Sequence, residues 1–389
     1  MSSPRASAML VGLIALGGRP ALAQSFQEID AAVHEGIHRG IYPGAVVVIG
    51  RRDSILYSRG YGHFTWNPAS SVPTPDSTLW DIASITKVMG TTSAAMRLVD
   101  SGRLELNEPV HRYLPRFSGG LRDQVTIRML LDHTSGLRSY APLFKEARTR
   151  AGAIEALYRE RPVRQPGDLP VYSDLNAILL GLVVESVSQT TLDAFVTREV
   201  FHPLNLQETT YSPAPAIRRR TVPTAIWRGH PVQGQVNDPN AAVLGGVAGH
   251  AGIFSTGMDL ARYAQVWLRN GAGPQGQWVS QATVRHFLSR GSKSGPRLLG
   301  WDTPEPDKAE PSLYGTLISN AAYGHTGFTG TEVWVDPTND LFLVFLTNRT
   351  FDPKVSDSGH RLRSIRTEIS DAALRLVPHA CQQELVAQC

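Results

Sequence analysis

Hydrophobic residues recur at helical spacing in some parts of this chain and form short runs in others, and the order of these patterns predicts the fold. Apolar residues recur at helical spacing over residues 26–37, which predicts a helix with one apolar face. Apolar runs at residues 45–49 and 55–61 then predict two strands of a hairpin that turns at residues 51–53. The chain therefore begins with a helix followed by antiparallel strands.

Similar patterns continue to the C-terminus, and the middle of the chain is rich in helical periodicity. The further predicted elements are a helix at 84–101, a mainly helical stretch at about 105–230, a helix at 258–269, strands at 332–335 and 341–346, and a last helix at 358–376. This order predicts an α/β (α+β) fold in which an antiparallel sheet is flanked by the terminal helices. An all-helical domain, at about residues 105–230, is inserted between the strands.

The first 23 residues have the pattern of a signal peptide. Arg5 precedes a short apolar run at residues 6–16, and Ala21, Leu22 and Ala23 form a small-x-small cleavage sequence. We therefore predict cleavage between Ala23 and Gln24 and a periplasmic or secreted protein. The apolar run is shorter than the ~20 residues that a membrane span needs, so no stable membrane anchor is expected.

Residues 24–380 are predicted to form one folded domain, followed by a tail at 381–389. Hydrophobic residues make up 42% and charged residues 19% of the chain, which is typical of a globular protein. The formal net charge is +4, and no basic run is interleaved with aromatics, so nucleic acid is not an expected partner. The two cysteines, Cys381 and Cys389, lie in the tail, either as a disulfide or as two free thiols.

The strongest chemical signal is a serine followed three positions later by a lysine. Ser84 and Lys87 lie at i and i+3, so a helix brings the hydroxyl and the amine onto one face. A serine hydroxyl becomes a good nucleophile when a base removes its proton, and a lysine acts as that base when its pKa is lowered. The chain has five lysines, and none of the other four follows a serine at this spacing.

Two later tripeptides supply the partners that such a nucleophile needs. Tyr172 precedes a helix-like run at residues 175–184, and its phenol is a candidate proton relay. His325, Thr326 and Gly327 precede a predicted strand, and the glycine lets a substrate lie along the strand edge. The backbone N–H of Phe328 is a candidate to form an oxyanion hole together with the N–H of Ser84.

With these motifs in order, the chain resembles the serine β-lactamase and penicillin-binding-protein superfamily, within its class C β-lactamase-like branch. Ser84 to Lys87 matches S-x-x-K, Tyr172 to Asp174 approximates Y-x-N, and His325 to Gly327 approximates K-T-G. The resemblance covers about residues 26–372 and includes residues 43–45, 130–137, 249–256 and 346–349.

The resemblance implies a β-lactamase/transpeptidase-like fold and an acyl-enzyme on Ser84 that water hydrolyses, with no cofactor and no metal. The implied substrates are small molecules or peptides, namely D-amino-acid peptides, esters or β-lactams. Class A β-lactamases are disfavoured because the E-x-x-L-N motif of their deacylating glutamate is absent between the second and third motifs.

Two departures from the family motifs alter the expected chemistry. Asp174 replaces the usual asparagine, and a carboxylate beside Lys87 favours the ammonium form and shifts the role of base towards Tyr172. Which of the two is the main base stays open. His325 replaces the usual lysine, and a neutral imidazole holds a substrate carboxylate less firmly. Arg349 is equally a candidate to supply the missing positive charge and to be a surface residue.

Two alternative functions follow from the same sequence. His34, Glu35 and His38 spell H-E-x-x-H, the pattern of a zinc protease. The other alternative is a penicillin-binding sensor that becomes acylated without turnover. His133 and His250 are expected to make structural hydrogen bonds near the cleft. Tyr140 and Trp301 are candidates to line the pocket, but aromatics beside turns more often pack in the fold.

Overall fold

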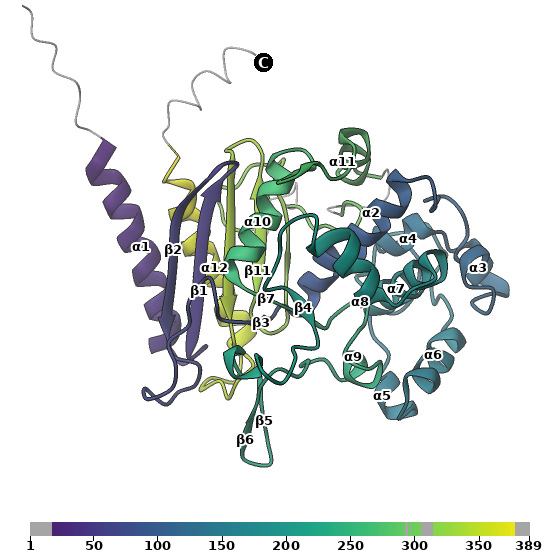
Figure 1. Ribbon diagram of the computed structural model, residues 1–389, viewed down its shortest axis with the longest axis horizontal. Helices are drawn as coiled ribbons and strands as arrows, with labels where there is room; N and C mark the ends of the chain where they lie inside the picture. Colours follow the sequence, from purple (N-terminus) through teal and green to yellow (C-terminus); the bar gives the residue numbers. More distant parts are fainter. Residues whose placement is uncertain (1–17, 292–294, 296, 305–313, 378–389) are drawn as a thin grey trace, which may run out of the picture.

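The computed structural model describes residues 18–291, 295, 297–304 and 314–377, and it is built around a five-stranded antiparallel sheet (Figure 1). The strand order is β10–β11–β12–β1–β2, so the N-terminal hairpin pairs with the C-terminal strands. The bounds are β1 (Gly44–Arg51), β2 (Ser54–Gly62), β10 (Tyr323–Thr326), β11 (Glu332–Asp336) and β12 (Leu341–Thr347). The predicted antiparallel sheet is confirmed.

Helices cover both faces of this sheet. Side chains of a strand alternate between its faces, so Val47 packs with α1 (Gly18–His38) and α12 (Ser358–Leu374), whereas Val46 and Val48 belong to the opposite core. On that second face, α10 (Gly257–Leu268) lies between the sheet and the helical part of the molecule (Figure 1). Burial on both faces explains why β1 and β12 are continuous apolar runs.

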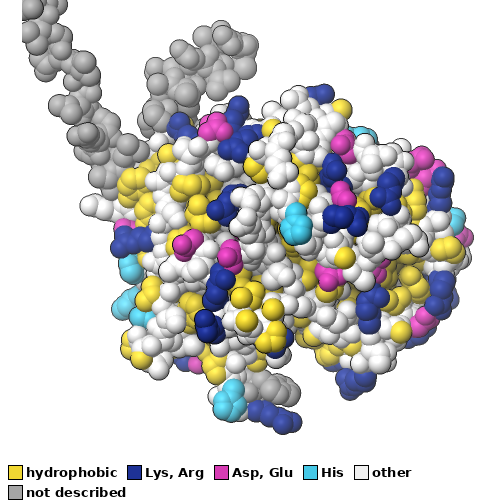
Figure 2. All heavy atoms as spheres, viewed as in Figure 1, with side chains coloured by type: hydrophobic (Ala, Val, Ile, Leu, Met, Phe, Trp, Pro, Cys, Tyr) yellow, Lys and Arg dark blue, Asp and Glu magenta, His cyan; other side chains and the backbone are white. Residues whose placement is uncertain are grey.

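The helical part of the molecule surrounds α7 (Asp174–Ser188), whose first residue is one of the predicted site residues. Its other helices are α2 (Ser93–Asp100), α3 (Val110–Tyr113), α4 (Ile127–Leu131), α5 (Leu143–Glu146), α6 (Arg150–Arg159), α8 (Leu192–Val196) and α9 (Pro239–Val243), and α11 (Gln281–Phe287) follows α10 along the chain. On the face in Figure 2, basic and acidic side chains are interspersed.

Short strands interrupt this helical part, which was expected to contain helices alone. β4 (Thr210–Tyr211) pairs with β7 (Ile253–Ser255), which also pairs with β3 (Trp80–Asp81) directly before the nucleophile. The chain also forms two small hairpins, β5 (Ala225–Trp227) with β6 (His230–Val232) and β8 (Ala272–Gly273) with β9 (Gly276–Gln277). The sheet of β3, β7 and β4 joins the helical part to the turn that carries Ser84.

The segment predicted as one helix at 84–101 consists of three helical types in succession. A 3₁₀ turn, η1 (Ala83–Ile85), leads into a π-helix, η2 (Lys87–Thr92), and then into α2. π segments are uncommon and are frequent at functional sites, and here the irregularity begins at the nucleophile.

The two ends of the chain differ in how far they can be compared with the predictions. α1 begins at Gly18 and runs through the predicted cleavage point after Ala23, and cleavage there stays a prediction. Cys381, Cys389 and the tail at 381–389 lie outside the described residues. Among the described helices, none alone is long and apolar enough to cross a membrane. One pair of helices, α7 and the segment Leu192–Phe201, is long and apolar enough when taken together, but the pair is bent by 75°.

Candidate active site

The predicted site residues meet around one cavity of about 690 Å³ between the sheet and the helical part. Four of them line the cavity from three elements. Ser84 lies in η1, Tyr172 directly precedes α7, Asp174 is the first residue of α7, and His325 lies on β10. Thr326 and Phe328 line it as well. Side chains that are far apart in sequence are thus brought to one place, as the motifs predict.

The turn that presents Ser84 is held by a buried carboxylate that sequence reasoning missed. Asp81 accepts hydrogen bonds from the backbone N–H of Ala83 (2.9 Å) and of Asn237 (2.7 Å). Burial raises the pKa of Asp81 to about 6. Ala83 has a φ of 47°, a left-handed conformation that costs a residue with a Cβ about 1 kcal/mol or more. Asp81 therefore stabilises a strained turn directly before the nucleophile.

Lys87 is buried beneath Ser84, and acceptors surround its ammonium group. Nζ lies 2.8 Å from Ser84 Oγ, 2.8 Å from Asp174 Oδ1 and 3.3 Å from the carbonyl oxygen of His250. Burial lowers the pKa of Lys87, but the charges and hydrogen bonds of Tyr172 and Asp174 outweigh it, and the pKa is raised. An ammonium group has three donors and no lone pair. Asp174 thus favours the charged form, as its position in the sequence predicts.

Two cations lie close to the ring of Tyr172. Lys87 Nζ is 4.9 Å and Arg297 Cζ 5.0 Å from the centre of this ring. Positive charges at this distance stabilise negative charge that develops on the phenolic oxygen during proton transfer. His133, whose ring also contacts that of Tyr172, accepts hydrogen bonds from the backbone N–H of Ser173 and the side-chain amide of Asn176, both at 3.1 Å. The structural role predicted for His133 is confirmed.

His325 does not supply a positive charge at the position of the family lysine. Its Nδ1 lies 2.8 Å from the carbonyl oxygen of Thr326, which can only accept, so Nδ1 carries the proton. Burial is the main cause that lowers the pKa of His325 to about 4. The imidazole is therefore neutral at pH 7, in agreement with the sequence argument.

Gly327 allows the end of β10 to approach the nucleophile turn. A Cβ added at Gly327 would lie 2.1 Å from Thr331 Oγ1 and 2.5 Å from the carbonyl oxygen of Ile82. Thr331 in turn donates to that same carbonyl oxygen at 3.0 Å. Phe328 follows with its side chain 67% exposed at the cavity edge. The role of its N–H in an oxyanion hole stays a prediction.

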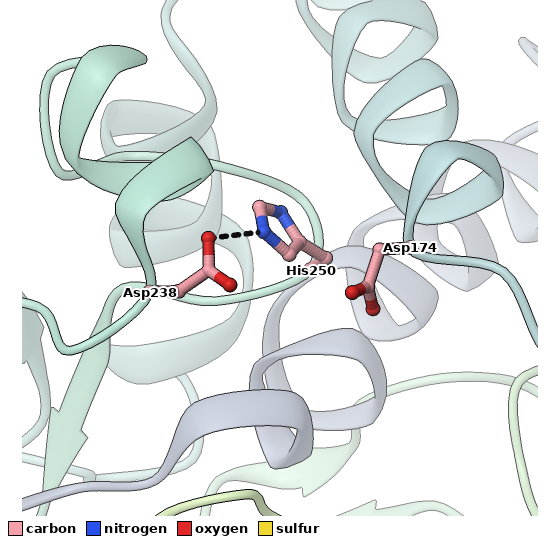
Figure 3. A group of neighbouring side chains, drawn as sticks. All are labelled: Asp174, Asp238 and His250. Carbon is pink, nitrogen blue, oxygen red and sulfur yellow. Dashed lines mark hydrogen bonds and ion pairs between the residues drawn. The ribbon is translucent and has the colours of Figure 1, made fainter. Parts of the chain in front are cut away.

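Asp238 and His250 form a further pair in the cavity wall (Figure 3). His250 Nε2 lies 2.8 Å from Asp238 Oδ1, which also accepts from the N–H of Ala241 and so caps α9. Burial raises the pKa of Asp238, but the hydrogen bond and charge of His250 outweigh it and lower the pKa overall. His250 thus makes a hydrogen bond near the cleft, as predicted, and its backbone carbonyl touches Lys87.

Asp174, Asp238 and His250 offer ligand atoms within 4.8 Å of one another, the one such group among the described residues (Figure 3). A cation does not fit there, because the Lys87 ammonium is already bound to Asp174 and would repel it. The side chains of His34 and His38 are exposed on α1 and belong to no such group in the described part of the chain. The geometry thus gives no support to a zinc protease.

A cation that lines the cavity comes from a segment that sequence reasoning did not single out. Arg297 lines the cavity and forms an ion pair with Asp302, also a lining residue. Arg349, the cation considered from sequence, instead donates to the carbonyl oxygen of Phe328 and lies over its ring. No spacing or motif in the sequence distinguishes Arg297 from the other arginines.

The two aromatic residues considered for the pocket have different locations. Tyr140 lines the cavity, the less frequent of its two possible roles. Trp301 is 1% exposed and packs against Tyr263, Trp267 and Tyr323 in the core, which is the role that the sequence favours for an aromatic beside a turn.

Comparison with known proteins agrees with this geometry. The profile of the family described as "Beta-lactamase" matches residues 29–366. The chain is 30% identical over 372 residues to an N-acetylmuramyl-L-alanine amidase of Bacillus subtilis (strain 168), covering 85% of this chain and 82% of that protein. It is 29% identical over 364 residues to a protein of Escherichia coli (strain K12) named "Putative D-alanyl-D-alanine carboxypeptidase", covering 85% and 83%.

Among solved structures, a class C β-lactamase superposes with a TM-score of 0.72 at 19% identity, covering 90% of this chain and 96% of the other. At that identity the likeness establishes the fold, while the family profile and the relatives in sequence establish the ancestry. With Ser84, Lys87 and Tyr172 assembled at one cavity, the chain belongs to the β-lactamase family and is a serine hydrolase of the β-lactamase, D,D-peptidase and esterase type.

Proposed function

We propose that this protein hydrolyses amide or ester bonds through an acyl-enzyme on Ser84, with D-amino-acid peptides, esters or β-lactams as substrates. The observation that carries the proposal is the 2.8 Å contact between Lys87 Nζ and Ser84 Oγ at an open cavity. The names of the two relatives, an amidase and a D-alanyl-D-alanine carboxypeptidase, support peptides of the cell wall as the substrate class. The signal-peptide pattern supports a periplasmic or secreted location.

The proposed acylation step needs no lone pair on Lys87. Ser84 Oγ attacks the substrate carbonyl, and Tyr172 accepts the serine proton while it gives its own proton to the leaving amine or alkoxide. The ammonium of Lys87 stabilises the negative charge that develops on both oxygens. The N–H groups of Ser84 and Phe328 are proposed to bind the oxyanion. Deacylation runs the same relay with water as the nucleophile and Ser84 as the leaving group.

The test compares the wild type with Ser84→Ala on a p-nitrophenyl ester, a chromogenic cephalosporin and a D-Ala-D-Ala peptide. Turnover of at least one substrate by the wild type, its loss in the variant, and an acyl adduct on Ser84 by mass spectrometry are the expected results. Equal activity of the two proteins would refute the Ser84 mechanism. Inhibition by a chelator would restore the zinc alternative through His34 and His38, and labelling by a fluorescent penicillin without turnover would favour the sensor alternative.

A further inference from the structure

The cavity contains more carboxylates than cations. Asp81, Asp174, Asp238 and Asp302 line it, whereas its cations among the described residues are Arg297 and the underlying Lys87. Both cations are paired, Lys87 with Asp174 and Arg297 with Asp302. His325, at the position of the family lysine, is neutral because Nδ1 donates to a carbonyl and the ring is 2% exposed. The described lining thus offers a substrate carboxylate no unpaired cation.

Backbone contacts fix the ion pair of Arg297 and Asp302 at the edge of the site. The two residues face each other across a β-bridge, and Leu298 N donates to Trp301 O at 2.9 Å between them. Asp302 also exchanges two backbone hydrogen bonds, 2.9 and 3.0 Å long, with Gly324 on β10. Asp302 is therefore anchored beside the strand that carries His325.

The location of the pair gives it a direct effect on substrates. The two side chains are 19% and 18% exposed, so the pair is partly desolvated, and its charges are less screened than those of a surface pair. The guanidinium lies over the ring of Tyr172, the proposed proton relay. A substrate carboxylate that approaches Arg297 therefore also meets the negative charge of Asp302, and like charges at short distance are a common device for rejecting a ligand.

We propose that Asp302 neutralises the charge of Arg297 and that this sets the substrate preference of the active site. Acyl substrates that are uncharged beyond the scissile bond are preferred, and substrates that carry a free carboxylate there are disfavoured. This inference rests on the proposed acyl-enzyme function and narrows its substrates. It favours neutral esters and peptides whose C-terminus is amidated or continues as a chain. It disfavours a free D-Ala-D-Ala terminus and the carboxylate of a β-lactam.

The test uses two peptides that differ in one charge, diacetyl-L-Lys-D-Ala-D-Ala and its C-terminal amide. Release of D-Ala or D-Ala-amide by mass spectrometry gives kcat/KM for each, and the acid-to-amide ratio is the readout because it does not depend on the fraction of active enzyme. The wild type is expected to have a ratio below one. Asp302→Asn is expected to raise the ratio roughly tenfold, the size of one charge interaction at a partly exposed site.

Two variants make the result specific. Arg297→Gln combined with Asp302→Asn should lose the gain, because the unmasked cation is then absent. Asp53→Asn, which removes an exposed carboxylate paired with Arg269 at 3.0 Å, should leave the ratio at the wild-type value. The same ratio is measured on 4-acetoxybenzoate and 4-acetoxybenzamide, so that an enzyme restricted to esters also gives a result.

The outcomes separate this inference from the function on which it rests. A wild-type ratio above one, or a ratio in Asp302→Asn that stays the same or falls, would overturn the selection by Asp302 while the acyl-enzyme stands. Activity in Ser84→Ala equal to that of the wild type would overturn the function itself. A tenfold gain that disappears in the double variant supports both.

Discussion

Replacing Asp174 by asparagine restores the residue that the family usually has at the third position of its Y-x-N motif. The replacement tests how the site controls the charge of Lys87. In the wild type, the carboxylate lies 2.8 Å from Nζ and opposes the effect of burial on the pKa of Lys87. Without it, burial acts against Tyr172 alone, and we expect a lower pKa. Neutral Lys87 then has a lone pair that can accept the proton of Ser84, so a second base becomes available.

The size of the effect follows from the geometry. Two unit charges 2.8 Å apart attract by about 6 kcal/mol at an effective dielectric constant of about 20 and by about 1.5 kcal/mol at that of water. The side chain of Asp174 is 20% exposed, which places the attraction between these limits. Because about 1.4 kcal/mol changes a protonation equilibrium tenfold, we expect the neutral fraction of Lys87 at pH 7, and with it the contribution of the second base to kcat/KM, to rise roughly tenfold or more.

The assay is the pH profile of kcat/KM for a neutral p-nitrophenyl ester between pH 5 and 9. In the wild type Lys87 stays an ammonium, so it should contribute no acidic limb in this range. In Asp174→Asn a new acidic limb set by Lys87 should appear, because the second base acts only after Lys87 has lost its proton. Asp53→Asn is the matched control, since it removes a carboxylate that does not line the cavity. A reduced rate with no new acidic limb would refute the reasoning and would show that Asp174 is needed to position Lys87.

Three further predictions concern the surroundings of the site. Gly327→Ala should lower kcat/KM by about tenfold or more with the fold retained, because its Cβ would overlap Thr331 and push β10 away from Ser84; Gly152→Ala, on α6, is the control. His325→Gln should remove a pH dependence of the free energy of unfolding, measured by urea denaturation. The pKa of His325 is about 4 in the folded protein and ordinarily 6.5, so the wild type loses up to about 3 kcal/mol of this free energy as the pH falls from 6.5 to 4. Arg366→Met should reduce the free energy of unfolding by about 3–5 kcal/mol at pH 8, because it leaves the buried Glu332 unpaired.

Each of these has a result that would contradict it. For Gly327, undiminished activity of the alanine variant would show that the strand end tolerates displacement. For His325, stability that falls equally in variant and wild type would assign the acid sensitivity elsewhere. Burial raises the pKa of Glu332 to about 7, so the loss in Arg366→Met should be smaller at pH 5, where the carboxyl is protonated. An equal loss at both pH values would mean that packing, and not charge, explains it.

The parts of the fold that the sequence predicts are those governed by local periodicity. β1 and β12 are short continuous apolar runs, and the apolar stripe of α1 recurs about every 3.6 residues; the structure confirms all three elements. Ser84 and Lys87 are equally local, since three positions on a helical turn bring their side chains together.

The remainder of the site depends on contacts between loops that no period encodes. Asp81 binds the backbone of Asn237, 156 positions away, and Arg297 reaches Tyr172 from a turn before β10. Asp81 binds backbone N–H groups, and Arg297 contacts a ring and the carboxylate of Asp302, so no pair of sequence motifs identifies either residue. The π-helix after Ser84 was missed for a related reason, because its helical composition resembles that of an ordinary α-helix.

The departures from the family motifs act in one direction. Asp174 adds a negative charge where the family carries a neutral amide, and His325 removes a positive charge where the family carries lysine. Asp302 cancels the cation that Arg297 would otherwise offer. Each change alone would weaken one step of the family chemistry, but together they lower the charge of the whole cavity. A less positive cavity suits a substrate without a carboxylate. When such a substrate binds, an unpaired cation in the pocket would lose its water without gaining a contact in return.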